Sequence, residues 1–228
     1  MVRKDNISAI EELAASEGGI FTSAQAARMD IPRYALSHAA AAGHIDRVYH
    51  GAYRLSSSVS SELDNLRAAY KLTVPYAFSH ERMGAFDGVA ICGRTAAYLL
   101  NIGDMQPTPW QIGVPKRFNS RMEGVQFRMM QLNENGVIWL DGLPVTRIEL
   151  TLKRLIEDHE EESLVADAFI DAVRRYGATT FDMDRLEYEL GIKTVESLLS
   201  AAGIRNSGPY ELLPIDALGH VALRERGI

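Results

Sequence analysis

The chain has 228 residues, of which 46% are hydrophobic and 24% are charged, and its formal net charge is −6. These values lie near the averages of folded globular proteins and exclude a largely disordered chain, while the length allows one large domain or two small ones. The charge balance is zero over residues 1–55, +2 over 56–155 and −8 over 156–228. The acidity therefore belongs to the C-terminal third, and the negative total does not exclude a nucleic-acid partner for the rest.

The sequence predicts a cytoplasmic protein. Charged residues are spread over the first twenty positions, so the apolar core of a secretory signal is missing. No apolar run reaches membrane-spanning length. Cys92 is the single cysteine, which excludes an internal disulfide framework and a multi-cysteine metal site.

The first helices are marked by apolar spacing and by a cap. Ile7, Ile10 and Leu13 recur at helical spacing and predict a helix over residues 7–15, which the glycine pair at 18–19 ends. Residues 22–25 form a capping box, in which a threonine hydroxyl and a glutamine amide satisfy exposed backbone groups at a helix start. A second helix is therefore expected over residues 23–29.

A third helix and a hairpin follow. Asp30 tolerates a left-handed turn and Pro32 suits a first helical position, so a helix is expected from residue 32 to about 42, with Gly43 as its stop. Residues 45–55 resemble strands on both sides of a Gly turn. Three helices and a hairpin predict a winged helix-turn-helix over residues 1–55.

In such a module the second helix of the turn unit enters the major groove, and its neighbour braces against the backbone. Leu36, Ala39 and Ala40 are expected to face the core. The outer face of the third helix, the start of the second helix and the hairpin then supply the predicted DNA-binding residues: Thr22, Ser23, Arg33, Tyr34, Ser37, His38, Arg47, Tyr49, His50 and Arg54. The alternative is a winged helix used only for protein contacts. The alanine run at residues 39–42 lacks cations, which indicates modest affinity from this module alone.

Two segments of this region together resemble the N-terminal domain of AbiEi-type antitoxins: residues 18–27 (GGIFTSAQAA) and residues 43–54 (GHIDRVYHGAYR). The resemblance continues more loosely through residues 90–100, 112–117 and 143–152, and so covers about three quarters of the chain. It implies an antitoxin of a toxin-antitoxin pair linked to abortive phage infection. Such a protein represses its own operon through the winged helix and opposes a nucleotidyltransferase-like toxin encoded beside it.

The rest of the chain predicts a second domain. Residues 56–61 are composed like a flexible linker, and residues 62–228 are expected to form a mixed α/β domain with an acidic, helical C-terminal region. The overall class is therefore α+β. Helices are expected at 62–72, 95–101, 147–158, 163–176, 184–190 and 195–202, and strands at 110–115, 125–132 and 137–140.

Two charged groups stand out in this second part. A basic group with neighbouring phenylalanines, Phe118 and Phe127, is compatible both with a second nucleic-acid surface and with a solvated loop over two core aromatic residues. Its members are Lys116, Arg117, Arg121 and Arg128. The acidic run at residues 157–162 is typical of a solvated helix end; the competing hypothesis is a surface complementary to a cationic toxin.

No sequence pattern for catalysis is found. The chain lacks a nucleophile elbow, a phosphate-binding Gly-rich loop, a His-Glu-x-x-His motif and a dinucleotide fingerprint. The pair Asp182 and Asp184 has the spacing of some metal-binding carboxylates, but helix capping is the favoured interpretation. We therefore expect no enzyme, no metal and no cofactor. The alternatives are a stand-alone regulator with a ligand-sensing C-terminal domain and, third, a winged helix fused to a nuclease.

Overall fold

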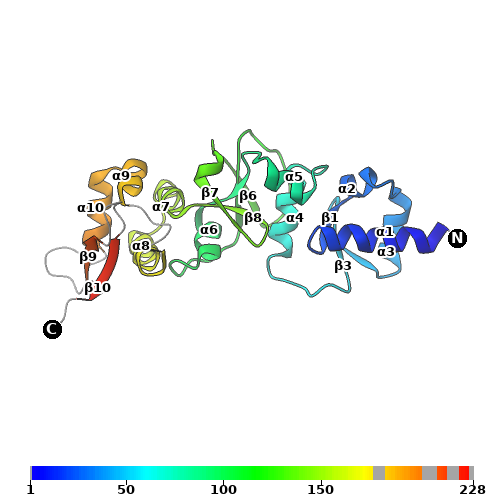
Figure 1. Ribbon diagram of the computed structural model, residues 1–228, viewed down its shortest axis with the longest axis horizontal. Helices are drawn as coiled ribbons and strands as arrows, with labels where there is room; N and C mark the ends of the chain where they lie inside the picture. The colour runs from blue at the N-terminus through cyan, green and yellow to red at the C-terminus, as the bar shows by residue number, and fades with distance from the viewer. Residues whose placement is uncertain (1, 177–182, 202–209, 215–220, 226–228) are drawn as a thin grey trace. The chain divides into compact units, whose positions relative to one another are not determined.

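A computed structural model describes residues 2–176, 183–201, 210–214 and 221–225 of the chain. It contains both helices and sheets, as Figure 1 shows, and this confirms the predicted α+β class. The chain divides into two compact units, which are described separately below.

The first unit contains a winged helix. Its elements in chain order are α1 (Val2–Ser16), β1 (Ile20–Thr22), α2 (Ser23–Arg28), α3 (Arg33–Ala41), β2 (Ile45–Tyr49) and β3 (Ala52–Leu55). The strands form an antiparallel sheet in the order β1-β3-β2. Leu13, Phe21, Leu36 and Ile45 are buried in its core. The expected helices and hairpin are thus present, while β1, with three residues, is too short to show a periodic pattern.

Local sequence signals explain where these helices begin and end. The Thr22 hydroxyl accepts a hydrogen bond from the Gln25 backbone N–H at 3.0 Å, and the Thr22 N–H donates to Gln25 Oε1 at 2.8 Å. The predicted capping box is therefore confirmed. Asp30 adopts a φ of 58° and Gly43 a φ of 76°, so both occupy the left-handed turns that their residue types allow.

The first unit extends beyond the winged helix. It also contains α4 (Asp64–Thr73), α5 (Ser79–Gly84) and the segment Val114–Gln131, in which β6 (Val125–Met129) lies. Ala68 and Leu72 of α4 pack against Ile20 and Ala52 of the winged helix. Because α4 covers this apolar face, residues 56–61, where a domain boundary was expected, lie inside one compact unit. A functional division at residues 56–61 stays a prediction.

A buried polar network fixes α4 and α5 to the winged helix. Lys71 Nζ on α4 donates to Glu17 Oε2 at 2.6 Å and to Ser79 Oγ at 2.7 Å. Gln25 Nε2 donates to the same carboxylate at 2.8 Å, and the Ser79 hydroxyl donates to it at 2.8 Å. The side chains of Glu17 and Lys71 are 1% and 9% exposed. No periodic pattern marks this pair in the sequence, because its members lie 54 positions apart.

The second unit is built around β4 (Ala90–Ile91), β5 (Trp110–Val114), β7 (Val137–Leu140) and β8 (Leu143–Thr146). These strands follow one another in the order β5-β4-β8-β7, with β4 antiparallel to β5 and parallel to β8. Helices and a further hairpin complete the unit: α6 (Gly93–Leu100), η1 (Glu134–Gly136), α7 (Ile148–Glu157), α8 (Glu162–Tyr176), α9 (Met183–Leu190), α10 (Ile192–Ala201), β9 (Tyr210–Pro214) and β10 (Val221–Glu225).

The helices expected in this unit are all present, with ends that differ by at most three residues. Helix α7 packs against α6, α8 and α9, and buries Leu152 and Leu155. The helical C-terminal region predicted from the sequence is therefore confirmed over α7–α10. The short strands β4 and β8 were not expected, because two to four residues carry too little pattern to be distinguished from a loop.

Candidate nucleic-acid interface

Helix α3 has one buried and one exposed face. Ala35, Leu36 and Ala39 are 5%, 2% and 1% exposed, and Ala40 is half-buried against the same core. The opposite face is open to solvent and consists of the residues predicted for it, namely Arg33, Tyr34, Ser37 and His38. The helix therefore presents a cation, a phenol, a hydroxyl and an imidazole outward, which are side chains that reach base edges and phosphates in helix-turn-helix complexes.

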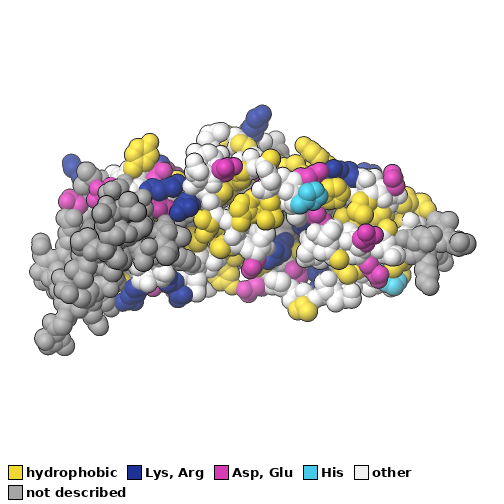
Figure 2. Space-filling view, viewed as in Figure 1, with side chains coloured by type: hydrophobic (Ala, Val, Ile, Leu, Met, Phe, Trp, Pro, Cys, Tyr) yellow, Lys and Arg dark blue, Asp and Glu magenta, His cyan; other side chains and the backbone are white. Residues whose placement is uncertain are grey.

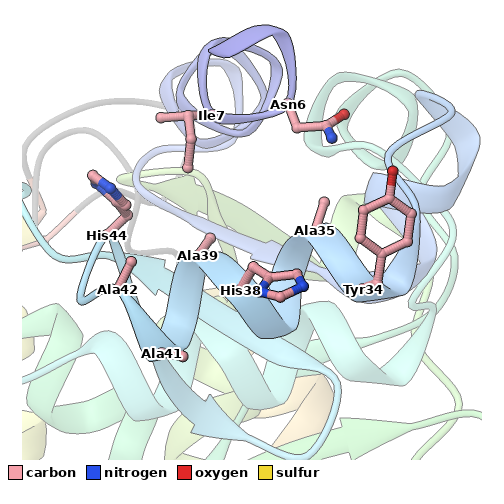
Figure 3. Close-up of a pocket in the computed structure, with 9 residues that line it drawn as sticks. All are labelled: Asn6, Ile7, Tyr34, Ala35, His38, Ala39, Ala41, Ala42 and His44. Atoms are coloured by element: carbon pink, nitrogen blue, oxygen red, sulfur yellow. The ribbon is translucent and has the colours of Figure 1, made fainter. Parts of the chain in front are cut away.

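A groove of about 780 Å³ runs beside this face. In Figure 3, Asn6 and Ile7 of α1 lie on one side, and Tyr34 and His38 of α3 lie on the other. The Tyr34 and His38 rings stand edge to face, with centroids 6.2 Å apart. Three alanines of the cation-free run, at positions 39, 41 and 42, line the groove. Their small side chains leave it open and add no positive charge to α3.

The wing is the tight hairpin between β2 and β3. Arg47 and His50 are exposed, and Arg47 Nη2 lies 2.7 Å from His50 Nδ1. Tyr49 is half-buried, and its hydroxyl donates to the Glu123 carbonyl oxygen at 3.1 Å. Burial, and secondly the negative charge of Glu123, raise the pKa of the Tyr49 phenol. Tyr49 therefore remains a neutral hydrogen-bond donor that joins the wing to the segment 114–131.

Two residues predicted to contact DNA are occupied elsewhere. Arg54 donates to Asp46 Oδ2 at 2.7 Å, lies 3.7 Å from Asp64 Oδ2, and donates to the Ser58 carbonyl at 3.3 Å. Its charge is thus compensated by carboxylates. Thr22 is fully buried, since its hydroxyl caps α2 and also donates to the Pro75 carbonyl oxygen. The buried Thr22 side chain is closed to a duplex, whereas Arg54 stays a predicted contact whose charge is shared with two carboxylates.

Ser23 occupies an intermediate position at the start of α2. Its side chain is half-buried, and its backbone N–H donates to the Gly51 carbonyl oxygen at 2.9 Å. The second helix is therefore attached to the tip of the wing, so the turn unit and the hairpin are held as one body. Ser23 remains a predicted contact to the sugar-phosphate backbone of DNA.

The second basic group lies in the first unit, on Val114–Gln131. Lys116, Arg117 and Arg121 are exposed, whereas Arg128 is half-buried on β6 and its Nη2 donates to Gln126 Oε1 at 3.2 Å. The two phenylalanines predicted beside them pack on each other, with ring centroids 4.6 Å apart. Both rings are half-buried, and the second nucleic-acid surface stays a prediction.

The structure brings Arg121 to the wing. A second groove, of about 810 Å³, is lined by residues 47–50 of the wing, by Leu72 of α4 and by residues 119–123. Arg47, Tyr49 and His50, which the sequence assigned to one site, thus share this groove with Arg121, which it assigned to another. No sequence signal could have shown this, because the two segments are about 70 positions apart.

The acidic run is engaged within the second unit. Arg154 pairs with Glu157 and Asp158 on its own helix, and Glu160 accepts a hydrogen bond from Arg94 Nε at 2.9 Å. Hydrogen bonding to Asp158 outweighs burial and raises the pKa of Arg154 further. These contacts favour the helix-end interpretation of the run over a free acidic surface.

The described residues hold no cluster of three or more His, Cys, Asp or Glu side chains arranged to bind a metal. Asp182 lies outside the described residues, and Asp184 falls in the first turn of α9. Within the same part of the chain, no helix is long and apolar enough to cross a membrane. On the face shown in Figure 2, the described Lys and Arg side chains lie in small groups among Asp and Glu rather than in one continuous patch.

Comparison with known proteins agrees with this geometry. The chain is similar in fold to the crystal structure of the RV2827C protein from Mycobacterium tuberculosis, with a TM-score of 0.58 over 85% of this chain and 75% of that chain, at 17% sequence identity. A search of curated proteins gave no match. A family model described as "Transcriptional regulator, AbiEi antitoxin" matches residues 8–56. The resemblance inferred from the two N-terminal segments is therefore confirmed over residues 8–56, the segment that builds the winged helix.

Proposed function

We propose that this protein is the antitoxin of a toxin-antitoxin pair and that it represses its own operon by binding operator DNA through α3 and the wing. The observation that carries the proposal is the exposed face of α3, in a segment that matches a regulator family. A helix of nine residues whose apolar side is buried and whose polar side is open has the dimensions and the chemistry of a major-groove reader.

The proposed contacts divide into two classes. Arg33 lies at the N-terminal end of α3, the end that contacts base edges in helix-turn-helix proteins, and its guanidinium can donate two hydrogen bonds to a guanine. Tyr34, Ser37 and His38 follow on the same exposed face. Arg47 and His50 of the wing contact phosphates and thereby fix the register of α3 without reading sequence.

The partner opposed by this antitoxin is proposed to be a nucleotidyltransferase-like toxin encoded beside it. The support is the family resemblance, since the acidic run that could have formed a docking surface is paired internally. We propose that the protein acts in the cytoplasm, without catalysis and without a cofactor. Neutralisation is expected to depend on residues beyond position 61 rather than on α3.

The DNA-binding part is tested with duplexes from the region upstream of the chain's own operon, by fluorescence anisotropy. Arg33→Ala should weaken operator binding about 5- to 100-fold, which corresponds to the 1–3 kcal/mol of one bidentate base contact. Arg175→Gln, which removes an exposed cation from α8, is the matched control and should change affinity less than twofold. Equal losses in both variants, or no binding by the wild type, would contradict the proposal.

The antitoxin part is tested in cells that express the adjacent toxin. Wild type and Arg33→Ala should both restore growth, because neutralisation is assigned to another part of the chain. If neither restores growth although the wild type binds the operator, the chain is a stand-alone regulator. If Arg33→Ala alone fails to restore growth, the proposed separation of the two activities is wrong.

A further inference from the structure

The wing of this protein is short. Strand β2 ends at Tyr49 and β3 begins at Ala52, so His50 and Gly51 alone form the tip. The Gly51 carbonyl accepts the Ser23 N–H, and a Cβ atom added to Gly51 would lie 3.5 Å from Ser23 Oγ and 3.6 Å from Leu72 Cδ2. The tip is thus held against α2 and α4 and does not project as a free loop that could follow a DNA backbone.

The winged helix also has few cations to offer a duplex. Of its described side chains, Arg28 is paired with Glu81 at 2.7 Å and Arg54 with Asp46 at 2.7 Å. Arg33 and Arg47 remain as exposed arginines without a carboxylate pair among the described contacts. Because phosphate neutralisation supplies much of the affinity for DNA, a duplex bound by this module needs cations from elsewhere.

Residues 119–123 supply such a group next to the wing. Arg121 is exposed and lines the same groove as Arg47 and His50. Asn119, also in the groove, accepts a hydrogen bond from Arg117 Nε at 3.2 Å. The Tyr49 hydroxyl, bonded to the Glu123 carbonyl, holds the segment against the wing. The groove therefore has donors from both chain segments and a hydrogen bond that joins the two segments.

The donors of the wing are themselves oriented. An arginine guanidinium has only N–H donors, so the 2.7 Å contact with Arg47 Nη2 makes His50 Nδ1 an acceptor. In the neutral imidazole the proton then lies on Nε2, which is the donor left for a ligand. Opposing these groups, the exposed carboxylate of Glu123 is the acidic side chain in the groove lining.

We propose that this wing–loop groove, formed by residues 47–50 and 119–123, binds the sugar-phosphate backbone of the duplex that α3 reads. The inference rests on the proposed function and adds to it a second chain segment that completes the short wing. A phosphate backbone fits because the groove is open and its lining includes guanidinium, imidazole, amide and hydroxyl groups beside the apolar Val48, Leu72 and Met122. Arg121 is the principal phosphate contact from the loop, and Glu123 limits the affinity.

The test compares two variants of the full-length protein in the same groove. Arg121→Gln removes a positive charge, and Glu123→Gln removes a negative charge. Each phosphate contact contributes a slope of about −0.9 to log K against log salt, so its loss costs about fivefold in affinity at 0.15 M salt. Arg121→Gln should weaken binding about fivefold and make the slope shallower by about one. Glu123→Gln should strengthen binding about two- to fivefold, and it keeps the backbone carbonyl that Tyr49 uses.

The sequence dependence distinguishes this site from α3. Because the groove contacts backbone, Arg121→Gln should weaken binding to the operator and to a random duplex by the same factor, whereas Arg33→Ala should affect the operator selectively. Arg175→Gln serves again as the charge control, and thermal melting shows whether each variant is folded. Unchanged affinity and salt slope in Arg121→Gln, with Arg33→Ala still defective, would overturn the groove and leave the proposed function intact. Absence of DNA binding by the wild type would overturn both.

Discussion

Replacement of Lys71 by methionine tests whether the buried network holds α4 and α5 on the winged helix. Methionine keeps most of the side-chain volume and removes the cation that lies 2.6 Å from Glu17. The carboxylate of Glu17, at 1% side-chain exposure, then retains hydrogen bonds from Gln25 and Ser79 but loses its charge partner. Such a change leaves a buried charge uncompensated.

Removing one member of a buried ion pair typically costs about 3–5 kcal/mol. Because Gln25 and Ser79 still donate to Glu17, we expect the lower limit of this range, a loss of about 3 kcal/mol in the local unfolding free energy of the first unit. In the double variant Glu17→Gln with Lys71→Met, both charges are absent. The remaining cost is that of imperfectly satisfied amide and hydroxyl groups, about 1–3 kcal/mol. The double variant should therefore be more stable than Lys71→Met alone.

The assay is hydrogen exchange of α4 amides followed by mass spectrometry at increasing urea, because it reports the first unit separately. Both tryptophans, Trp110 and Trp139, lie in the second unit. Their fluorescence transition is the internal control and should shift little. The reasoning would be refuted if Lys71→Met lowered the local unfolding free energy by no more than about 1 kcal/mol, as for a solvent-exposed pair. It would also be refuted if the double variant were less stable than Lys71→Met.

Three further results are expected. Thr22→Ala removes the cap of α2 and should cost about 1–2 kcal/mol in the exchange of α2 amides; a loss under about 0.5 kcal/mol would contradict the cap's role. Burial raises the pKa of Glu17, but hydrogen bonds and the charge of Lys71 outweigh it and hold that pKa below its ordinary 4.5. The stability that Glu17 contributes is therefore present above pH 4.5 and is lost as the pH falls further, and Glu17→Gln should flatten this acid dependence in the same assay. Glu160→Ala breaks an ion pair with an arginine of α6 and should lower the unfolding free energy measured by tryptophan fluorescence by about 1–2 kcal/mol. Glu161→Ala should change the same free energy by no more than about 0.5 kcal/mol.

The sequence was sufficient where the signal is local. The capping box at Thr22 and Gln25 and the left-handed turn at Asp30 depend on neighbours within a few positions, and both were predicted with their physical cause. The spacing of Leu36 and Ala39 likewise determined which side of α3 is buried. These contacts define the winged helix, and with it the proposed reading face.

Contacts between distant segments were not predictable in the same way. Arg54 was predicted as a phosphate contact because it is a cation on the wing. Its partner Asp64 lies on α4, and only the packing of α4 on the winged helix brings this carboxylate near. The same packing removes Thr22 from the surface. Arg121 shows the opposite case, because a residue predicted for a second surface lies beside the wing. The charge of an arginine alone therefore does not show whether it is paired within the protein or exposed beside the wing.

The number of available cations sets the salt dependence of DNA binding by this chain. If Arg47 is the only cation on phosphate, one contact gives a slope of about −0.9 in log K against log salt. If the loop adds Lys116, Arg117 and Arg121, four contacts give a slope of about −3.6 for one bound chain. Titrations of the operator between 0.05 and about 0.2 M salt distinguish these values. A measured slope no steeper than about −1 would mean that the loop cations stay away from the duplex, and that the short wing is not completed by residues 119–123.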